Sequence, residues 1–235
     1  MINVNILDRL ETSKVEVIKE LETWIIKTTD FNDQIPLLSQ YLSIKDTIEK
    51  EKIIKENFKK KFIVRKSLLR IILSDKLGIS PQEVEFSLND YGKPFLNYSN
   101  TEKIYFNISH SLDYFLIGVS KKSDLGVDIE CIRTLSNVTS LSEFVFSDEE
   151  KYILNSIAPQ LYEDFFYKIW VQKESISKAI GMGMNIDFKK ISVYKNINET
   201  EKVINNIIVN NNNLDVFLQH NNHYYLSICM LNKNL

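Results

Sequence analysis

Two acidic residues stand one position apart in the short apolar segment GVDIE, residues 126–130. If this segment is a strand, alternate side chains share a face, so Val127 and Ile129 point to the core while Asp128 and Glu130 project together from the other side. Two strand positions span about 6.6 Å, and bare charges at that distance repel by about 2.5 kcal/mol at an effective dielectric constant of about 20. A divalent cation would relieve the repulsion, and ligation by oxygen alone suits Mg²⁺. The alternative is a solvated strand face, the commoner use of an isolated pair.

A second group of side chains has helical spacing. Trp170, Glu174 and Lys178 lie four residues apart, so on a helix they form one stripe. Glu174 would supply a third carboxylate, and Lys178, one turn later, would reach a phosphate oxygen. The alternative is an ordinary Glu–Lys helix pair, which contributes about 0.3–0.5 kcal/mol.

Two further segments place polar groups in expected turns. Residues 109–111, Ser-His-Ser, are expected between two strands, where His110 would donate to a phosphate or carry a proton. A local turn-capping cluster is the alternative. Gly92 and Pro94 form a rigid turn that presents Lys93 outward, although an ordinary turn lysine fits the same pattern.

The elements that would position these groups alternate between helix and strand. The sequence predicts helical structure up to about Leu77, ended by Gly78. Ser147 with Glu150 predicts the start of another helix through a capping box, and a long helix is expected after it. The predicted strands lie at 103–107, 114–120, 125–130, 188–194, 203–209, 214–219 and 224–231, and the predicted long helix at 161–180.

This order of elements predicts the fold class. The first three strands are close in sequence and suggest an antiparallel meander. Helices followed by strands occur twice, which predicts an α+β fold of two pseudo-symmetric halves, 1–122 and 123–235. A cleft between two such halves is a favoured place for a ligand.

Composition narrows the function classes. The 235 residues are 44% hydrophobic and 26% charged, typical of a globular protein, and the net charge of −2 offers no overall basic surface for nucleic acid. No apolar run approaches the ~18 residues of a membrane helix, and the N-terminus lacks a secretory pattern. We therefore expect a cytoplasmic protein that binds neither nucleic acid nor membrane. Cys131 and Cys229 have no metal or redox spacing and are expected in the core.

Taken together, the four segments resemble a known family. GKP at 92–94, NISHS at 107–111, GVDIE at 126–130 and W-x-x-K-E-S-x-x-K-x-x-G-x-G at 170–183 resemble, in this order, the motifs of surfactin-type 4′-phosphopantetheinyl transferases. The resemblance runs from about Phe58 to Met184. It implies two halves that bind coenzyme A in the cleft between them. It also implies transfer of the 4′-phosphopantetheine arm to a serine of an apo acyl or peptidyl carrier protein, with release of adenosine 3′,5′-bisphosphate.

The resemblance assigns roles to individual residues. It implies that Asp128, Glu130 and Glu174 hold Mg²⁺, with Mn²⁺ as the alternative ion. Catalytic roles would fall to Glu174, Lys178 and His110, with Glu174 taking the serine proton directly or through a metal-bound water. The residues implied in coenzyme A binding are Lys93, Ser109, His110, Lys173, Lys178, Lys61 and Arg65. Lys61 and Arg65 belong to a basic run of a kind that is usually a solvated helix face.

The carrier protein is expected, by analogy with the family, near residues 132–164. Phe144, Val145, Phe146 and Leu161 would give an apolar contact there, although core packing is the commoner use of such residues. A monomer is the family expectation. Two other functions stay open: a metal-dependent nuclease, which the helical Glu–Lys spacing and the lack of basic excess disfavour, and a non-catalytic coenzyme A or carrier-binding protein.

Overall fold

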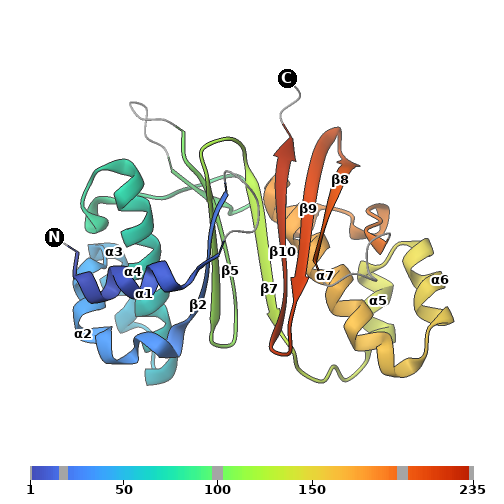
Figure 1. The fold of residues 1–235 in the computed structure, drawn as a ribbon, viewed down its shortest axis with the longest axis horizontal. Helices are drawn as coiled ribbons and strands as arrows, with labels where there is room; N and C mark the ends of the chain where they lie inside the picture. Colours follow the sequence, from blue (N-terminus) through green and yellow to red (C-terminus); the bar gives the residue numbers. More distant parts are fainter. Residues whose placement is uncertain (1, 16–20, 97–102, 195–200, 233–235) are drawn as a thin grey trace.

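The structure is a computed structural model and describes residues 2–15, 21–96, 103–194 and 201–232. Two four-stranded antiparallel sheets lie side by side in the middle of the molecule, and helices cover their outer faces (Figure 1). The predicted α+β class is confirmed. The first sheet has the strand order β1 (Lys14–Val15), β2 (Leu21–Lys27), β6 (Tyr114–Ser120) and β5 (Tyr105–Ser111). The second has the order β7 (Leu125–Cys131), β10 (Tyr224–Asn232), β9 (Asn212–His220) and β8 (Glu201–Val209).

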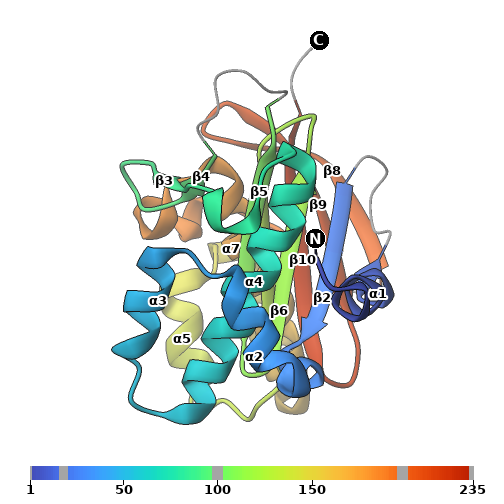
Figure 2. The same cartoon turned by 90° about the vertical axis from the view of Figure 1, so that its left-hand side faces the viewer.

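The helices divide between the halves in the same way. The first half carries α1 (Val4–Thr12), α2 (Ile35–Leu38), α3 (Ile44–Glu51) and the long α4 (Glu56–Leu77), which lies across the first sheet (Figure 2). The second half carries α5 (Val138–Val145), α6 (Asp148–Ser156) and the long α7 (Tyr162–Ile180). A small hairpin, β3 (Ser87–Leu88) with β4 (Pro94–Phe95), precedes β5. No helix in the described part of the chain is long and apolar enough to cross a membrane.

Both halves share one topology. Each runs from a strand into a long helix and then into an antiparallel pair, and the last strand lies beside the first: β2, α4, β5 and β6 in one half, and β7, α7, β9 and β10 in the other. An apolar layer that includes Val127, Leu226 and Leu116 packs between the two sheets, so the halves share a core. The expected division between residues 122 and 123 lies in the connection from β6 to β7, and we keep it as a proposal.

Several local predictions are confirmed. Gly78 and Gly181 adopt left-handed conformations, with φ of 67° and 80°, and end α4 and α7. The capping box of Ser147 and Glu150 starts α6. Cys131 and Cys229 are both buried.

The sequence prediction is wrong at three places. The first stretch is not wholly helical, because Leu21–Lys27 forms strand β2, which pairs with β6. The three strands from 103 to 131 do not form a meander, because β7 pairs with β10 instead of β6. Residues 188–194 form no strand but begin with a 3₁₀ turn, Phe188–Lys190. Their backbone instead hydrogen-bonds with the buried ion pair of Lys173 and Glu150. The carbonyl of Phe188 accepts from Lys173, and the amide of Val193 donates to Glu150.

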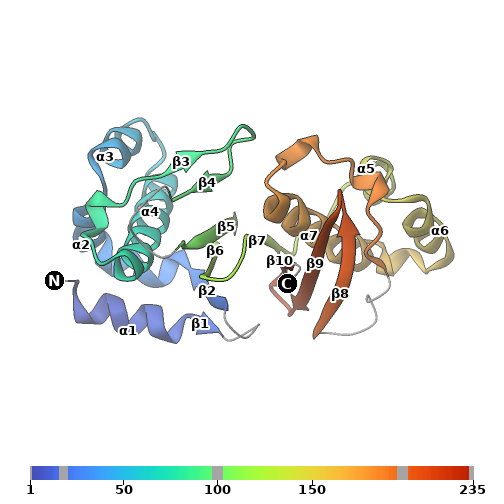
Figure 3. The same ribbon diagram turned by 90° about the horizontal axis from the view of Figure 1, so that it is seen from above.

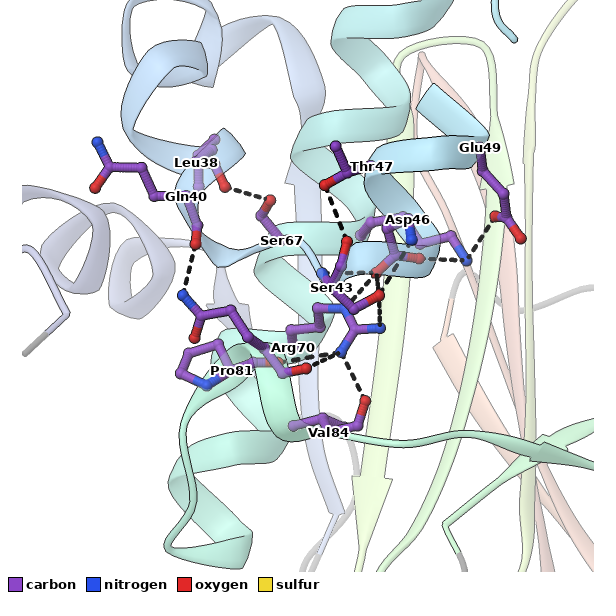
Figure 4. A network of polar contacts seen from close by, with 12 residues as sticks. Leu38, Gln40, Ser43, Asp46, Thr47, Glu49, Ser67, Arg70, Pro81 and Val84 are labelled. Atoms are coloured by element: carbon purple, nitrogen blue, oxygen red, sulfur yellow. Dashed lines mark hydrogen bonds and ion pairs between the residues drawn. The ribbon is translucent and has the colours of Figure 1, made fainter. Parts of the chain in front are cut away.

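A buried arginine fixes the helical layer of the first half. Arg70 on α4 donates to Asp46 and Ser43 at the start of α3 and to the carbonyls of Pro81 and Val84 (Figure 4). Burial raises the pKa of Asp46, but the hydrogen bond with Ser43 and the charge of Arg70 outweigh it and keep the pKa below its ordinary value. The charged network therefore holds α3 and the segment after α4 in one arrangement against α4.

Candidate active site

A glycine sets the distance between strand β7 and helix α7. A Cβ placed on Gly126 would lie 2.0 Å from the carbonyl oxygen of Ser175 and 2.3 Å from the amide nitrogen of Ala179, so only glycine fits. The helix therefore rests directly on the strand backbone. This contact brings Glu174 and Lys178 of α7 next to the acidic side chains of β7.

Asp128 lies at the centre of this contact and is 4% exposed. Its Oδ1 accepts hydrogen bonds from the hydroxyl of Ser109, at 2.8 Å, and from Nζ of Lys178, at 2.6 Å. Its Oδ2 is buried and has no hydrogen-bond partner among the described residues. An unsatisfied buried acceptor costs about 1–3 kcal/mol, so this oxygen is a strong candidate for contact with a ligand.

Glu130 projects from the same face of β7. One carboxylate oxygen accepts from the Ser111 hydroxyl at 2.8 Å, and the other accepts from the indole nitrogen of Trp170 at 3.4 Å. Burial, with a smaller contribution from the charge of Asp128, raises the pKa of Glu130. Trp170 also stacks on Phe166, so the indole that contacts Glu130 is itself packed.

Glu174 completes the acidic group. Burial raises its pKa to about 7, the charges of Asp128 and Glu130 add to the rise, and Lys178 opposes it. The three carboxylates therefore share one electrostatic environment. The described residues contain no three His, Cys, Asp or Glu side chains already arranged around a metal position, and Lys178 provides the positive charge beside Asp128.

The raised pKa of Glu174 predicts a pH dependence of stability. Between the ordinary pKa of 4.5 and the folded-state value of about 7, the folded chain binds a proton that the unfolded chain releases. The stabilisation is therefore complete below about pH 4.5 and is lost as the pH rises through about 7. We expect thermal unfolding in EDTA, from about pH 5 to about pH 8, to show the unaltered protein losing stability relative to Glu174→Gln. Parallel curves for the two proteins would contradict the assignment.

A cavity of about 880 Å³ lies on the other face of strand β5. Phe106, Ile108 and His110, alternate residues of β5, line one side of it, and Arg65 of α4 lies among the residues opposite. Burial, followed by the charges of Arg65 and Lys178, lowers the pKa of His110 to about 4, so the imidazole is neutral at pH 7. Burial also lowers the pKa of Arg65, which has no ion-pair partner in the described part of the chain. This charge is therefore available to an anionic ligand.

Three lysines expected to contact coenzyme A make contacts within the protein in this structure. Lys173 is 0% exposed, and its Nζ donates to Glu150 and to the carbonyls of Val145 and Phe188. Lys93 donates to Asp124 at 2.8 Å and to the carbonyls of Leu125 and Ala179, which ties the turn before β4 to β7 and α7. Lys61 pairs with Asp113 at 2.7 Å. A lysine at a motif position has the same sequence pattern whether it faces a ligand or an internal partner.

Strand β5 is longer than predicted, and this changes the roles of its polar residues. It continues to Ser111, so the expected turn at 109–111 is part of the strand. Ser109, expected at a phosphate, donates to Asp128 in this structure. Ser111 was not predicted as a site residue, yet it contacts Glu130. The polar residues at 107, 109 and 111 have the alternation of a strand face, and that pattern was the available signal.

Comparisons with known proteins bear on this site. The family profile "4′-phosphopantetheinyl transferase, N-terminal" matches residues 29–122, and the profile "4′-phosphopantetheinyl transferase superfamily" matches residues 124–229. A putative 4′-phosphopantetheinyl transferase of Synechocystis sp. is 30% identical over 64% of this chain and 61% of its own length. The 4′-phosphopantetheinyl transferase HetI of Nostoc sp. is 29% identical over 70% of both chains. The 4′-phosphopantetheinyl transferase gsp of Aneurinibacillus migulanus is 35% identical over 57% of this chain and 53% of its own.

The alignments with these three relatives thus span between about half and 70% of the relatives' own lengths. A crystal structure of a holo-(acyl-carrier-protein) synthase from Bacillus anthracis covers 48% of this chain and 97% of its own, with a TM-score of 0.35 and 16% identity, an overlap too weak to support a conclusion. The profiles follow one another along most of the sequence. Through them, and through the motifs that the fold gathers on β5, β7 and α7, this chain is shown to belong to the 4′-phosphopantetheinyl transferase superfamily.

Proposed function

We propose that this protein transfers the 4′-phosphopantetheine arm of coenzyme A to a serine hydroxyl of an apo acyl or peptidyl carrier protein. The observation that carries the proposal is the buried carboxylate of Asp128, whose Oδ2 has no partner among the described residues and which lies beside Glu130, Glu174 and Lys178. A large cavity with an unpaired Arg65 lies across β5 from this group. One region thus offers acidic oxygens, and the neighbouring cavity offers the guanidinium group of Arg65.

The donor set fits a hard divalent cation. All three candidate ligands are carboxylates, and their mutual repulsion contributes to the raised pKa values of Glu130 and Glu174. We propose that Asp128, Glu130 and Glu174 hold Mg²⁺, with Mn²⁺ as an alternative. When bound, the ion would neutralise charge on the phosphates of coenzyme A.

The chain's own residues would perform the remaining steps. The serine oxygen forms a bond to the β-phosphorus of coenzyme A, and the bond from that phosphorus to the bridging oxygen breaks. Adenosine 3′,5′-bisphosphate leaves with that electron pair. Glu174 would accept the serine proton. Lys178 and neutral His110 would donate hydrogen bonds to phosphate oxygens.

The carrier protein is proposed to dock on the second half, near residues 132–164. Phe144 and Leu161 are exposed there, at 76% and 48%, and can offer an apolar contact. Val145 and Phe146 are buried, which is the core packing given above as the commoner use of such residues. Both belong to the core beneath α5 and α7.

One experiment tests the function directly. The protein is incubated with coenzyme A, Mg²⁺ and an apo carrier protein, and the carrier is followed by mass spectrometry. We expect a gain of about 340 Da, the mass of the added arm, and no gain in EDTA. Binding of coenzyme A without any mass gain would favour the non-catalytic alternative. Cleavage of DNA without a mass gain would favour the nuclease.

Arg65 gives a prediction about coenzyme A binding. We expect Arg65→Ala to raise the KM for coenzyme A at least about tenfold, because a charge-assisted hydrogen bond contributes about 1.5–3 kcal/mol. The measurement is the KM of the mass-gain assay with coenzyme A and with 3′-dephospho-coenzyme A. Loss of the preference for coenzyme A would place the 3′-phosphate near Arg65.

Lys59→Ala is the matched control for Arg65. Lys59 is also on α4 but pairs with Glu51 and does not line the cavity. The KM of the Lys59→Ala variant for coenzyme A should stay within about twofold of that of the unaltered protein, because an exposed ion pair contributes little free energy. Equal changes in both variants would show that the cavity does not receive coenzyme A through Arg65.

A further inference from the structure

Strands β5 and β7 lie side by side at the junction of the two halves, but their backbones do not pair (Figure 3). Side chains of β5 fill the gap. The amides of Val127, Ile129 and Cys131 donate to Asn107 Oδ1, Ser109 Oγ and Ser111 Oγ, at 2.9, 3.3 and 3.1 Å. Each pair is 20 residues apart, so the strands run parallel and three alternate β5 side chains satisfy one edge of β7.

Two of these three side chains make a second hydrogen bond. The hydroxyl of Ser109 donates to Asp128, and the hydroxyl of Ser111 donates to Glu130, both at 2.8 Å. A hydroxyl has one proton and two lone pairs. The amide of Cys131 therefore occupies a lone pair of Ser111 and leaves its single proton for Glu130.

Ser111 is held from two sides. Its hydroxyl accepts from the Cys131 amide, and its carbonyl oxygen accepts from the Cys131 thiol at 3.1 Å. Glu130 is also held from two sides, by Ser111 on one oxygen and by Trp170 on the other at 3.4 Å. The bond from Ser111 is the shorter, and without it Glu130 retains only the longer one.

We propose that Ser111 is a positioning residue that orients the carboxylate of Glu130 for a divalent cation. The inference rests on the proposed function, because it takes Glu130 as a metal ligand. The partners that orient a ligating carboxylate typically affect metal affinity by about 10–100-fold. Ser111 would act on metal affinity through Glu130 and would not itself contact the ion.

Asn107 provides a matched control within the same strand. Its Oδ1 accepts from the amide of Val127 and so makes the same kind of junction bond as Ser111. In the described part of the chain, Asn107 makes no hydrogen bond to Asp128 or Glu130. Asn107→Ala therefore measures the effect of losing one hydrogen bond between β5 and β7. Any additional effect of Ser111→Ala is due to the loss of the hydrogen bond from the Ser111 hydroxyl to Glu130.

The test is a titration of Mn²⁺ into the full chain with coenzyme A present, with free Mn²⁺ followed by electron paramagnetic resonance. We expect Ser111→Ala to weaken the Mn²⁺ affinity at least about tenfold, Asn107→Ala to weaken it less than about threefold, and Ser111→Thr, which keeps the hydroxyl, to stay near the unaltered value. In the transfer assay Ser111→Ala should raise the Mg²⁺ concentration for half-maximal rate. The rate at saturating Mg²⁺ should change much less.

Failures of the inference and of the function have different signatures. Equal weakening by Ser111→Ala and Asn107→Ala, with normal Mn²⁺ binding by the unaltered protein, would overturn only the role of Ser111. No Mn²⁺ binding and no transfer by the unaltered protein would overturn the proposed function and this inference with it. If Ser111→Ala does not fold, Ser111→Cys takes its place, because a thiol is a weak donor of nearly the same shape. Unchanged affinity in that variant would also overturn the inference.

Discussion

Replacement of Asp128 by Asn should lower the rate of phosphopantetheine transfer at least about a hundredfold, the usual result of losing a principal charge-stabilising group. Asparagine keeps the shape of the side chain and one oxygen, but it removes the negative charge that pairs with Lys178 at 2.6 Å. The amide of asparagine also replaces one carboxylate oxygen of a proposed metal ligand, whose Oδ2 has no partner among the described residues. The measurement is the initial rate of carrier mass gain at saturating coenzyme A and Mg²⁺.

Glu174→Gln should cause a loss of similar size, because the same substitution removes a proposed ligand and the proposed proton acceptor. The double variant should be little worse than either single one, since groups that act as a unit have non-additive effects. Asp75→Asn is the control, because its carboxylate is exposed on α4, and it should keep the normal rate. Near-normal rates for both Asp128→Asn and Glu174→Gln would show that the carboxylate assignment is wrong.

Glu150→Ala should destabilise the protein by about 3–5 kcal/mol, the usual cost of removing one partner of a buried ion pair. Lys173 and Glu150 both have 0% exposed side chains, and their charged atoms are 2.5 Å apart. Loss of Glu150 leaves an ammonium that cannot reach water, and it also removes the acceptor for the Val193 amide. For a chain of this size we expect the midpoint of thermal unfolding to fall by roughly 6–20 °C.

The control for this pair is close in sequence. Glu143 and Lys151 form an ion pair at 2.7 Å between α5 and α6, but the Glu143 side chain is 61% exposed. Glu143→Ala should therefore cost less than about 1 kcal/mol. Comparable losses for Glu143→Ala and Glu150→Ala, measured by thermal unfolding, would contradict the buried-pair account.

The buried ion pair of Lys173 and Glu150 also connects the stability of the fold to the active site. Lys173 and Glu174 are neighbours on α7, and they point to different environments, one to the core pair with Glu150 and the other to Asp128. Because Lys173 ties α7 to α6 and to the segment at Phe188, it helps to fix where Glu174 lies on β7. Lys173, expected to contact coenzyme A, is buried in this structure and supports the site through the helix.

The sequence by itself determined the features that depend on local backbone geometry. The two-residue alternation in GVDIE placed Asp128 and Glu130 on one face, and the four-residue spacing placed Glu174 and Lys178 on one stripe. Gly78 and Gly181 ended their helices because a left-handed residue costs glycine little. Each of these inferences needs only residues a few positions apart.

Only the tertiary structure decided which partners those side chains meet. The ion pairs of Lys93, Lys173 and Lys178 join residues 31, 23 and 50 positions apart, and no local pattern separates the lysine that reaches Asp128 from the two that do not. For the same reason, the sequence did not show that β7 lies outside the expected meander. The backbone amides on one edge of β7 donate to β5 side chains 20 residues earlier. Hydrogen bonds and charges act over a few ångströms of space whatever the distance along the chain, so these choices appear only once the two halves have packed.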